Sequence, residues 1–582
     1  MRLSRRRLMT TALATAIAAA LAAAAPASAA PVPLDSDPAG ATLSTTGQAG
    51  TVLPATDPTG CNLDPAVPKR QLRAMWVASV TNIDWPTRAS GTAPDRIARQ
   101  QAEYRSWLDL AQRLNHNAVI VQVRPTADAF WPSPFEPWSE YLVARGARGQ
   151  DPGWDPLAFL VDEAHQRNLE FHAWFNPYRV SMPVNASDPT AAGADINRLA
   201  PDHPARAHPD WVQAYPVNVA GSRLYYNPGI PEVRRFVQDA MMDAVTRYDI
   251  DGVHFDDYFY PYPAAGQDFA DDATFAQYGA GFTSKGDWRR HNINLLVQEF
   301  GLRIKAAKPW VKFGISPFGI WRNRATDPLG SDTAGLQSYD AIYADTRTWV
   351  KQEWVDYILP QVYWHIGLAI ADYAKLVPWW ADVVAGTRVH LYIGQADYKI
   401  GEPAQPAQWH DPYEMSRHLT FNRAYPQVLG NVHFSAVQVR ANKLGATDIY
   451  AAAHYSRPAL VPAMPHLPAS PLVHPVVTDA ERESTGAVRL TWRPTAAEVA
   501  PPFGEPTGYA VYRFDGLAPQ EGADPCGFAD AAHLLATVRA TGAGPQSFVD
   551  STAQPGRRYT YYVSGLDRLW NESEPSPPRL VF

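Results

Sequence analysis

The chain has 582 residues, of which 46% are hydrophobic and 19% charged, and this composition excludes a mainly disordered protein. The length predicts one large domain with smaller appendages rather than a single core. A net charge of -7 argues against a dedicated nucleic-acid binder, which would normally carry a basic face.

The N-terminus has the pattern of an export signal. Arg5–Arg7 precede an Ala/Leu-rich apolar run and Ala27–Ala29 supplies a small-residue cleavage site, so residues 1–30 are predicted to be a twin-arginine-type signal peptide. An uncleaved anchor is the lesser alternative, and no later segment has the ~18 uninterrupted apolar residues of a membrane span. Residues 31–70 are interpreted as a flexible leader. We therefore expect a secreted or cell-wall-associated protein without a stable membrane anchor.

Export bears on the two cysteines of the chain. Cys61 lies in the leader and Cys526 near the C-terminus, so an oxidising compartment would allow an interdomain disulfide. Two free thiols are the alternative that stays open, because bridging requires a geometry that no sequence shows.

Residues 71–456 alternate short β-rich runs with amphipathic helical stretches. The predicted strands cover residues 73–80, 118–124, 170–176, 252–256, 311–316, 357–363, 388–394 and 432–435. Predicted helices between them include 101–114, 156–167, 231–248, 288–307 and 412–423. This alternation predicts an α/β fold, a (β/α)8 TIM-type barrel with long loops. An open doubly wound sheet is the main competitor, but no Gly-rich phosphate fingerprint follows any of the strands.

Successive strand side chains point to opposite faces, which predicts the positions that face the barrel interior. In the second strand Val119, Val121 and Val123 would face the helices, leaving Gln122 and Arg124 inward. The corresponding inward residues of other strands, towards their C-terminal ends, are His172, Trp174, Asn176, Ser316, Gln361, Tyr363, His433 and Ser435. Barrel active sites are built at that end, and although each residue alone could be a satisfied core polar group, their joint placement favours a site.

The stretch Asp251–Pro261 alternates polar and apolar residues and then stops at two carboxylates followed by aromatics. Val253 and Phe255 would cover the buried face, and Asp256 would emerge on the other face at the end of the strand. A solvated turn is the alternative for Asp256 and Asp257. Carboxylates beside neutral polar groups and aromatics, without a His/Cys cluster, point to glycosidic bond cleavage.

Several motifs make the chain resemble a known family across nearly all of residues 71–450. They are Arg73–Ser79, Asn82–Pro86, Gln122–Asp128, Phe171–Arg179, Asp251–Pro261, Phe313–Asn323 and Pro360–Trp364. On these motifs the chain resembles the glycosyl hydrolase-like 10 proteins of bacterial envelopes. The resemblance implies an exported barrel enzyme. Some members of that family act on peptidoglycan glycan strands, so it also implies a cell-wall or extracellular polysaccharide substrate.

A weaker similarity links the fourth strand to chitinase-like barrels, which carry an Asp-Gly-x-Asp-x-Asp-x-Glu pattern. Asp251, Gly252 and Asp256 match this pattern, but His254 replaces one Asp and Tyr258 replaces the catalytic Glu. The proton donor of that family is therefore missing at the matching position.

We expect Asp256 to be one of two catalytic carboxyl groups, with Asp257 as its first candidate partner and Asp128 or Asp397 as alternatives, because two nearby carboxylates split their pKa values. Adjacent strand residues point apart, so convergence of Asp256 and Asp257 requires the strand to break. The predicted substrate-binding residues are Arg124, Asp128, Trp131, Trp174, Asn176, Tyr178, Arg179, His254, Tyr258, Ser316, Trp321, Gln361, Tyr363 and Trp364. We expect no metal and no cofactor.

Two other functional classes stay open. His254, Asp256 and Asp257 could hold a divalent metal, as in a carbohydrate deacetylase, although such enzymes usually use more histidines. A degenerate barrel could instead bind glycan without cutting it, because a fold does not fix a function.

The composition changes after residue 456. Residues 457–471 are Pro-rich and are interpreted as a semi-rigid linker. Residues 472–582 show alternating strands separated by turn residues and resemble a fibronectin type III sandwich, with Trp492 in the core-tryptophan position. This region is expected to act as a spacer, a weak wall-attachment module or a structural cap on the barrel, and we expect the protein to be a monomer.

Overall fold

The computed structural model describes residues 61, 63–64, 67–469, 472–495, 505–516 and 525–582. The predicted signal peptide and the leader up to residue 60 lie outside these described residues. Within the described part of the chain, no helix is both long enough and apolar enough to cross a membrane.

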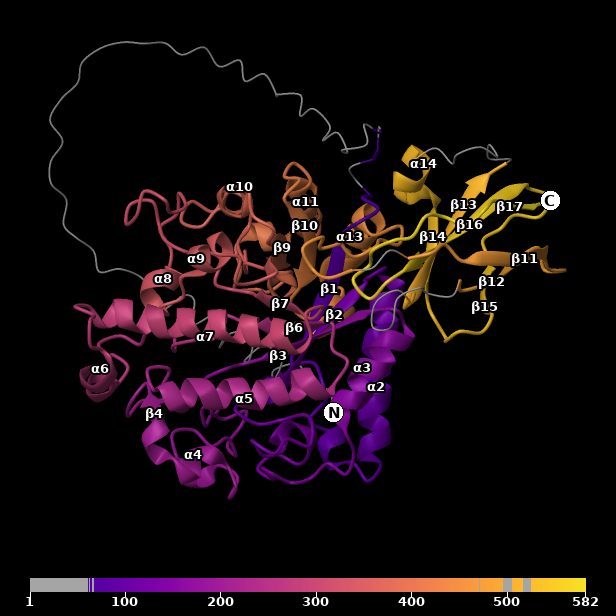
Figure 1. Cartoon of the computed structure of the whole chain (residues 1–582). Coiled ribbons are helices and arrows are strands. Elements are labelled where there is room, and N and C mark those ends of the chain that lie inside the picture. Colours follow the sequence, from indigo (N-terminus) through magenta and orange to yellow (C-terminus); the bar gives the residue numbers. More distant parts are fainter. Residues whose placement is uncertain (1–60, 62, 65–66, 470–471, 496–504, 517–524) are drawn as a thin grey trace, which may run out of the picture. The chain divides into compact units, whose positions relative to one another are not determined.

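Eight parallel strands close into a barrel in the order β1-β10-β9-β8-β7-β6-β3-β2 (Figure 1). They are β1 (Leu72–Val77), β2 (Ala118–Arg124), β3 (Glu170–Phe175), β6 (Gly252–Phe255), β7 (Lys312–Ile315), β8 (Tyr357–Ile358), β9 (His390–Gln395) and β10 (Val428–His433). The (β/α)8 TIM-type barrel predicted from the sequence is confirmed, and each of the eight predicted strands overlaps one of these.

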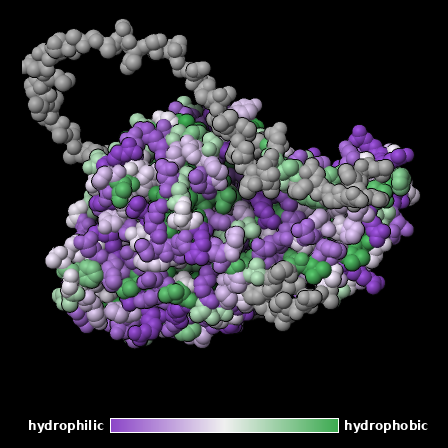
Figure 2. All heavy atoms as spheres, turned by 45° about the horizontal axis from the view of Figure 1, so that its top comes forward, coloured by the Kyte–Doolittle hydropathy of each residue, from purple (hydrophilic) through white to green (hydrophobic). Residues whose placement is uncertain are grey.

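Helices connect the strands and pack on the outside of the barrel, where α5 and α7 lie side by side (Figure 1). The helices of the barrel region are α2 (Arg96–Arg113), α3 (Pro156–Gln166), α4 (Pro204–Ala207), α5 (Pro231–Arg247), α6 (Asp272–Tyr278), α7 (Lys285–Ala307), α8 (Ser338–Ala341), α9 (Thr346–Lys351), α10 (Tyr373–Val384), α11 (Glu414–Asn422), α12 (Ala436–Ala441) and α13 (Ala446–His454). On the face shown in Figure 2, hydrophilic residues predominate and hydrophobic ones are scattered among them.

Some element boundaries differ from the prediction for local chemical reasons. β8 covers only Tyr357–Ile358 instead of residues 357–363, since Pro360 has no N–H to donate to a ladder. Between β3 and α5 the chain forms an antiparallel hairpin that the sequence did not indicate, made of β4 (Val212–Tyr215) and β5 (Arg223–Tyr226). This hairpin lies within one of the long loops expected of the barrel.

Side-chain alternation in β2 agrees with the prediction. Val119, Val121 and Val123 belong to the outer apolar core shared with the helices, whereas Ala118 and Ile120 belong to the inner cluster. The period of two holds as far as Gln122, but a register shift before Arg124 pairs that residue with Phe175 of the outer core, so the predicted inward position of Arg124 is wrong.

β10 is an exception, because His433 points outward and the predicted inward position is wrong. Val432 pairs with Ala74 and both lie in the inner cluster, whereas His433 pairs with Met75 of the outer core. The His433 ring stacks on Tyr450 of α13, with centroids 4.6 Å apart. In a parallel ladder the neighbouring strand fixes which residues face inward, so the register with β1 decides the face.

Two antiparallel sheets form a sandwich after the barrel. One has the order β11-β12-β15, with β11 (Val476–Arg482), β12 (Val488–Arg493) and β15 (Gln546–Asp550). The other has the order β14-β13-β16-β17, with β14 (Leu534–Arg539), β13 (Gly508–Asp515), β16 (Tyr559–Leu566) and β17 (Arg579–Val581), and α14 (Pro525–Ala529) lies between β13 and β14 in the chain. Trp492 is fully buried in the apolar cluster to which both sheets contribute. The predicted small all-β sandwich is confirmed.

The barrel and the sandwich share an apolar cluster. Leu460 and Met464, from the Pro-rich segment, belong to it together with Leu72 of the barrel and Trp570 of the sandwich. A disulfide joins Cys61 to Cys526 across 465 positions of the sequence. The interdomain disulfide considered from the sequence is therefore present, and it ties the residues before β1 to the sandwich.

Candidate active site

Two adjacent carboxyl groups follow β6 at the C-terminal end of the barrel strands. β6 ends at Phe255, and Asp256 and Asp257 come next, with only 6% and 5% of their surfaces exposed. Because the ladder ends before Asp256, strand alternation no longer forces the two side chains apart. Each carboxyl group has its own set of polar neighbours.

Asp256 is surrounded by hydrogen-bond donors. Its Oδ2 accepts from Asn176 Nδ2 at 2.5 Å and from Trp174 Nε1 at 3.2 Å, and its Oδ1 accepts from the backbone N–H of Tyr258 at 2.9 Å. Burial raises the pKa of Asp256, while the charge of Arg179 and these three donors oppose the rise. The net effect is a raised pKa, and the three donors and Arg179 limit that rise by stabilising the ionised form.

Asn176 is fixed by a second layer of contacts. Its Oδ1 accepts from Gln122 Nε2 at 2.6 Å and from Arg179 Nη2 at 3.0 Å, so its Nδ2 must point to Asp256. Arg179 also donates Nε to the carbonyl of Pro125 and lies 5.1 Å from the centre of the Tyr258 ring. Residues from the ends of β2 and β3 thus orient the group that binds Asp256.

Asp257 has fewer donors than Asp256, and its pKa is raised. Its Oδ1 accepts from Gln361 Nε2 at 2.9 Å, and its Oδ2 accepts from the hydroxyl of Tyr262. Burial and then the neighbouring negative charge of Asp256 raise the pKa of Asp257 to about 6. At mildly acidic pH a large fraction of Asp257 is therefore protonated.

His254 lies in the barrel interior beneath this pair. Its Nδ1 is 3.1 Å from the hydroxyl of Tyr357 and its Nε2 is 2.9 Å from Ser316 Oγ, while Trp76 Nε1 also donates to Nε2 at 3.2 Å. Burial lowers the pKa of His254 well below its ordinary value, and the charge of His172 acts in the same direction. His254 is therefore a neutral ring whose two nitrogens are already engaged.

A chain of aromatic rings borders the carboxyl groups. The ring of Tyr258 contacts that of Tyr262 edge-on at 5.5 Å, Tyr262 contacts Phe318 at 6.3 Å, and Phe318 contacts Trp364 at 5.4 Å. Tyr363 lies on the neighbouring loop against Tyr398, with centroids 5.8 Å apart. These rings offer edges and faces on which a sugar could stack.

Several predicted site residues are not brought to the pair. Arg124 is fully buried and its guanidinium binds Glu136 at 2.5 Å, which leaves the charge neutralised inside the loop after β2. Trp131 and Trp321 donate their indole N–H groups to Asp243 and Asp345, at 2.7 Å and 3.0 Å respectively. Their partners lie on α5 and next to α9, so these tryptophans pack toward the outer helices.

Tyr178 and the two alternative carboxylates, Asp128 and Asp397, also have partners other than the pair. Tyr178 is fully buried in the outer apolar core. Asp128 accepts from the backbone N–H of Thr126 at 2.9 Å and lines a hollow that His203 also lines. Asp397 binds the outward-facing His433 at 2.9 Å. The structure thus gives Asp257, rather than Asp128 or Asp397, as the carboxyl group beside Asp256.

Tyr262 and Phe318 contact the site but were not predicted from the sequence. Tyr262 lies four positions after Tyr258 in the same aromatic-rich run, and this proximity was a usable signal. Phe318 follows Ser316 within a motif that was recognised, but its inward direction depends on the loop conformation, which no periodicity encodes.

Metal binding by the predicted trio does not agree with these contacts. Within the described residues, no group of three or more His, Cys, Asp or Glu side chains is arranged to hold a metal ion. His254 in particular directs its two nitrogens to Tyr357 and Ser316. His254, Asp256 and Asp257 therefore do not form a common set of ligands.

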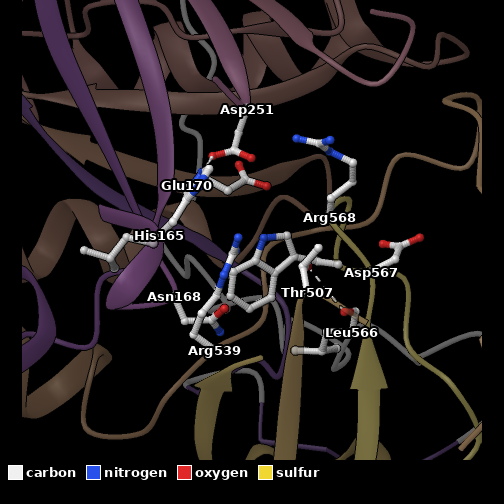
Figure 3. Close-up of a pocket in the computed structure, with 11 residues that line it drawn as sticks. His165, Asn168, Glu170, Asp251, Thr507, Arg539, Leu566, Asp567 and Arg568 are labelled. Atoms are coloured by element: carbon white, nitrogen blue, oxygen red, sulfur yellow. Dashed lines mark hydrogen bonds and ion pairs between the residues drawn. The ribbon is translucent and has the colours of Figure 1, made fainter. Parts of the chain in front are cut away.

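A second hollow lies at the opposite end of the strands, between the barrel and the sandwich (Figure 3). Glu170 at the start of β3 and Asp251 just before β6 line its barrel side. Arg568 extends into it from the sandwich side, and it binds Asp249 at 2.6 Å. Its position at the N-terminal ends of the strands is that of a structural contact, since barrel chemistry takes place at the other end.

Comparison with known proteins identifies the family. A family model described as "Glycosyl hydrolase-like 10" matches residues 71–411. The chain belongs to the glycosyl hydrolase-like 10 family. It is 48% identical over 510 residues to "Glycosyl hydrolase YngK" of Bacillus subtilis (strain 168), an alignment that covers 87% of this chain and 92% of the relative. The family resemblance seen in the sequence motifs is confirmed.

A second relative and a solved structure complete the comparison. The chain is 43% identical over 373 residues to "Glycosyl hydrolase DigH" of Escherichia coli (strain K12), covering 62% of this chain and 82% of that protein. The PgaB (BpsB) glycoside hydrolase domain from Bordetella bronchiseptica has a TM-score of 0.42 and 14% identity, covering 66% of this chain and 98% of that domain. The Glycosyl hydrolase-like 10 match covers the loops that carry the Asp256–Asp257 pair and its neighbours.

Proposed function

We propose that this protein is an exported glycoside hydrolase that cleaves O-glycosidic bonds in a cell-wall or extracellular polysaccharide, with peptidoglycan glycan strands as the first candidate. Asp256 and Asp257 are the proposed catalytic carboxyl groups. The observation that carries the proposal is the adjacent buried pair, in which Asp256 has three donors and Asp257 has a pKa raised to about 6. Membership of the family and two relatives named as glycosyl hydrolases support it.

The two carboxyl groups differ in the way that glycoside cleavage requires. A general acid must hold its proton until the leaving oxygen takes it, and its partner must stay ionised to stabilise positive charge on the sugar. Asp257 fits the acid because burial and the charge of Asp256 raise its pKa. Asp256 fits the anion because Asn176, Trp174 and a backbone N–H all donate to it.

Four half-buried aromatic residues support a sugar as the ligand. Tyr258, Tyr262, Tyr363 and Trp364 lie around the pair, each only partly covered by protein. Flat apolar faces beside buried polar groups suit the alternating faces and hydroxyls of a glycan. Gln361 and Arg179 donate to Asp257 and to Asn176, and so hold the polar groups beside these rings in place.

Export and the identity of the sandwich also belong to this proposal. The disulfide between Cys61 and Cys526 supports an oxidising compartment, in agreement with the twin-arginine pattern of residues 1–30. The three-stranded and four-stranded sheets and the buried Trp492 support a fibronectin type III domain over residues 472–582. The shared apolar cluster favours a capping role for this domain over a spacer role.

The test is a screen of the mature protein against purified polysaccharides. Peptidoglycan glycan strands stripped of peptides, chitin, and α- and β-glucans are incubated with the enzyme, and new reducing ends and released acetate are both measured. We expect new reducing ends from at least the peptidoglycan strands and no released acetate. Tight binding without new reducing ends would identify a glycan-binding barrel, and acetate release alone would identify a deacetylase.

A further inference from the structure

Asp256 and Asp257 are consecutive residues that both follow the end of β6, which restricts the mechanism. Their Cα atoms are about 3.8 Å apart because they are neighbours in the chain. In most glycosidases the two carboxyl groups instead flank the scissile bond, about 5–5.5 Å apart for retention or about 6.5–9.5 Å for inversion. A pair that starts from one strand end does not place a carboxylate on each side of the anomeric carbon.

Three other buried carboxylates near the strand ends are engaged elsewhere. Asp84 accepts from the backbone N–H groups of Ala78 and Val437, at 2.7 Å and 2.8 Å, and from Ser435 Oγ at 2.9 Å. Asp397 binds His433 on the outer face of the barrel. Asp128 accepts from a backbone N–H within its own loop. In the described part of the chain, none of these three carboxylates is hydrogen-bonded to Asp256 or Asp257, so none is assigned as a nucleophile facing the pair.

We propose that the substrate supplies the nucleophile, through the carbonyl oxygen of a 2-acetamido group next to the anomeric carbon that is attacked. Asp257 is the acid for the leaving oxygen, and Asp256 binds and orients the acetamido N–H. The inference rests on the proposed function and deepens it, because it restricts the substrate to β-linked 2-acetamido sugars at the cleaved position.

The hydrogen bonds of Asp256 leave one position for this N–H. Both acceptor positions of Oδ2 are taken, by Asn176 Nδ2 and Trp174 Nε1. Oδ1 accepts one bond, from the backbone N–H of Tyr258, and a carboxylate oxygen has two acceptor positions. Within the described residues the second position of Oδ1 has no donor, and an amide N–H from a ligand would complete the set.

The surroundings of Asp256 hold it as an oriented anion. Gln122 and Arg179 fix the amide of Asn176, so the carboxylate cannot rotate without losing its 2.5 Å bond. A fixed anion beside the acetamido nitrogen favours the positive charge that develops there as the carbonyl oxygen attacks. Asp257, with donors on both of its oxygens but a raised pKa, is the better proton source.

The atoms balance in two steps. In the first, the acetamido oxygen bonds to the anomeric carbon, the bond to the leaving oxygen breaks, Asp257 gives that oxygen its proton, and Asp256 takes the N–H proton, leaving a neutral bicyclic oxazoline. In the second, water adds to the anomeric carbon and gives a proton to Asp257. The bond between the anomeric carbon and the oxazoline oxygen breaks, and this oxygen becomes the acetamido carbonyl oxygen again. Asp256 returns the proton to the acetamido nitrogen. The result is hydrolysis with retained configuration.

The first experiment compares oligosaccharides that differ only at the 2-position. The native enzyme is given a β-linked hexamer of N-acetylglucosamine, its N-trifluoroacetyl analogue and the 2-hydroxy hexamer, and initial rates and the anomer of the first product are followed by NMR. We expect the trifluoroacetyl analogue to react at least about 10-fold more slowly, since fluorine withdraws charge from the carbonyl oxygen. We also expect the 2-hydroxy hexamer to be uncut and the β anomer to form first.

The second experiment separates the two carboxylates. A dinitrophenyl β-glycoside of a 2-acetamido oligosaccharide needs no acid for its leaving group. Asp257→Asn is therefore expected to recover most of its rate of forming the first product on this substrate, whereas Asp256→Asn is expected to stay roughly 100-fold or more below the native enzyme. Circular dichroism melting curves of both variants show that each is folded.

The outcomes distinguish the inference from the proposed function. Three outcomes would overturn substrate participation but leave the protein a glycosidase. They are equal rates on the acetyl and trifluoroacetyl hexamers, cleavage of the 2-hydroxy hexamer at the same rate, and a first product of inverted configuration. Recovery of Asp256→Asn on the dinitrophenyl glycoside would overturn the role given to Asp256. Absence of cleavage of every glycan would overturn both proposals together.

Discussion

Replacing Asp257 with asparagine should stabilise the protein at alkaline pH while removing its activity. The pKa of Asp257 is raised from 3.8 to about 6, which means that folding favours the protonated form. The contribution of protonated Asp257 to the free energy of unfolding is fully present below pH 3.8 and is lost as the pH rises through about 6. Above that range the buried negative charge costs about 3 kcal/mol relative to the unfolded chain. An asparagine side chain carries no such charge, so the Asp257→Asn variant avoids the cost.

Calorimetric melting of the native protein and of Asp257→Asn at pH 4 and pH 8 measures this effect. The mismatch between the asparagine amide and the donors Tyr262 and Gln361 is the same at both pH values, so the difference between them isolates the ionisation. The variant should gain about 3–4 °C at pH 8 relative to its shift at pH 4. Asp202→Asn, at an exposed aspartate, is the matched control and should show no such change. An equal shift of Asp257→Asn at the two pH values would refute the reasoning.

Three further predictions concern other contacts. Tyr262→Phe removes a donor that stabilises ionised Asp257, so the pKa of Asp257 should rise. The alkaline limb of the pH profile of kcat/KM should then move to higher pH by roughly half a unit to one unit, and an unmoved limb would contradict this. Cys61→Ser should lower the free energy of unfolding by roughly 2–5 kcal/mol, measured by denaturant titration. A reductant should lower the free energy of unfolding of the native protein by a similar amount and should leave that of the variant unchanged. Arg124→Ala leaves Glu136 as an unpaired buried charge and should cost about 3–5 kcal/mol in melting experiments, and Glu136→Gln in the same chain should recover part of it.

The barrel could be predicted from the sequence because its signals are local. Val119, Val121 and Val123 share one parity and Ile120 and Gln122 the other, so the period of two predicts the two faces of β2. The same period of two failed for His433, because the register of β10 is set by its neighbour β1 rather than by its own pattern. The hairpin of β4 and β5 has only four residues per strand, too few for alternation to identify.

The site could be predicted only in part, for a related reason. Strand ends and family motifs located Asp256, Asn176 and Gln361 near one another, since parallel strands end at one rim. Which partner each side chain takes is decided by loops. The pairing of Arg124 with Glu136, twelve positions later, neutralises a cation that the sequence suggested for substrate binding. No periodicity of the chain encodes that contact.

The most direct test of the proposed catalytic pair is the rate at which reducing ends appear from peptide-free peptidoglycan strands, compared among the native enzyme, Asp256→Asn and Asp257→Asn. All three proteins are matched for concentration and shown to be folded by their melting curves. The pair predicts steady release by the native enzyme and a loss of roughly 100-fold or more in each variant. Release by either variant at the native rate would contradict the assignment of Asp256 and Asp257 as the catalytic carboxyl groups.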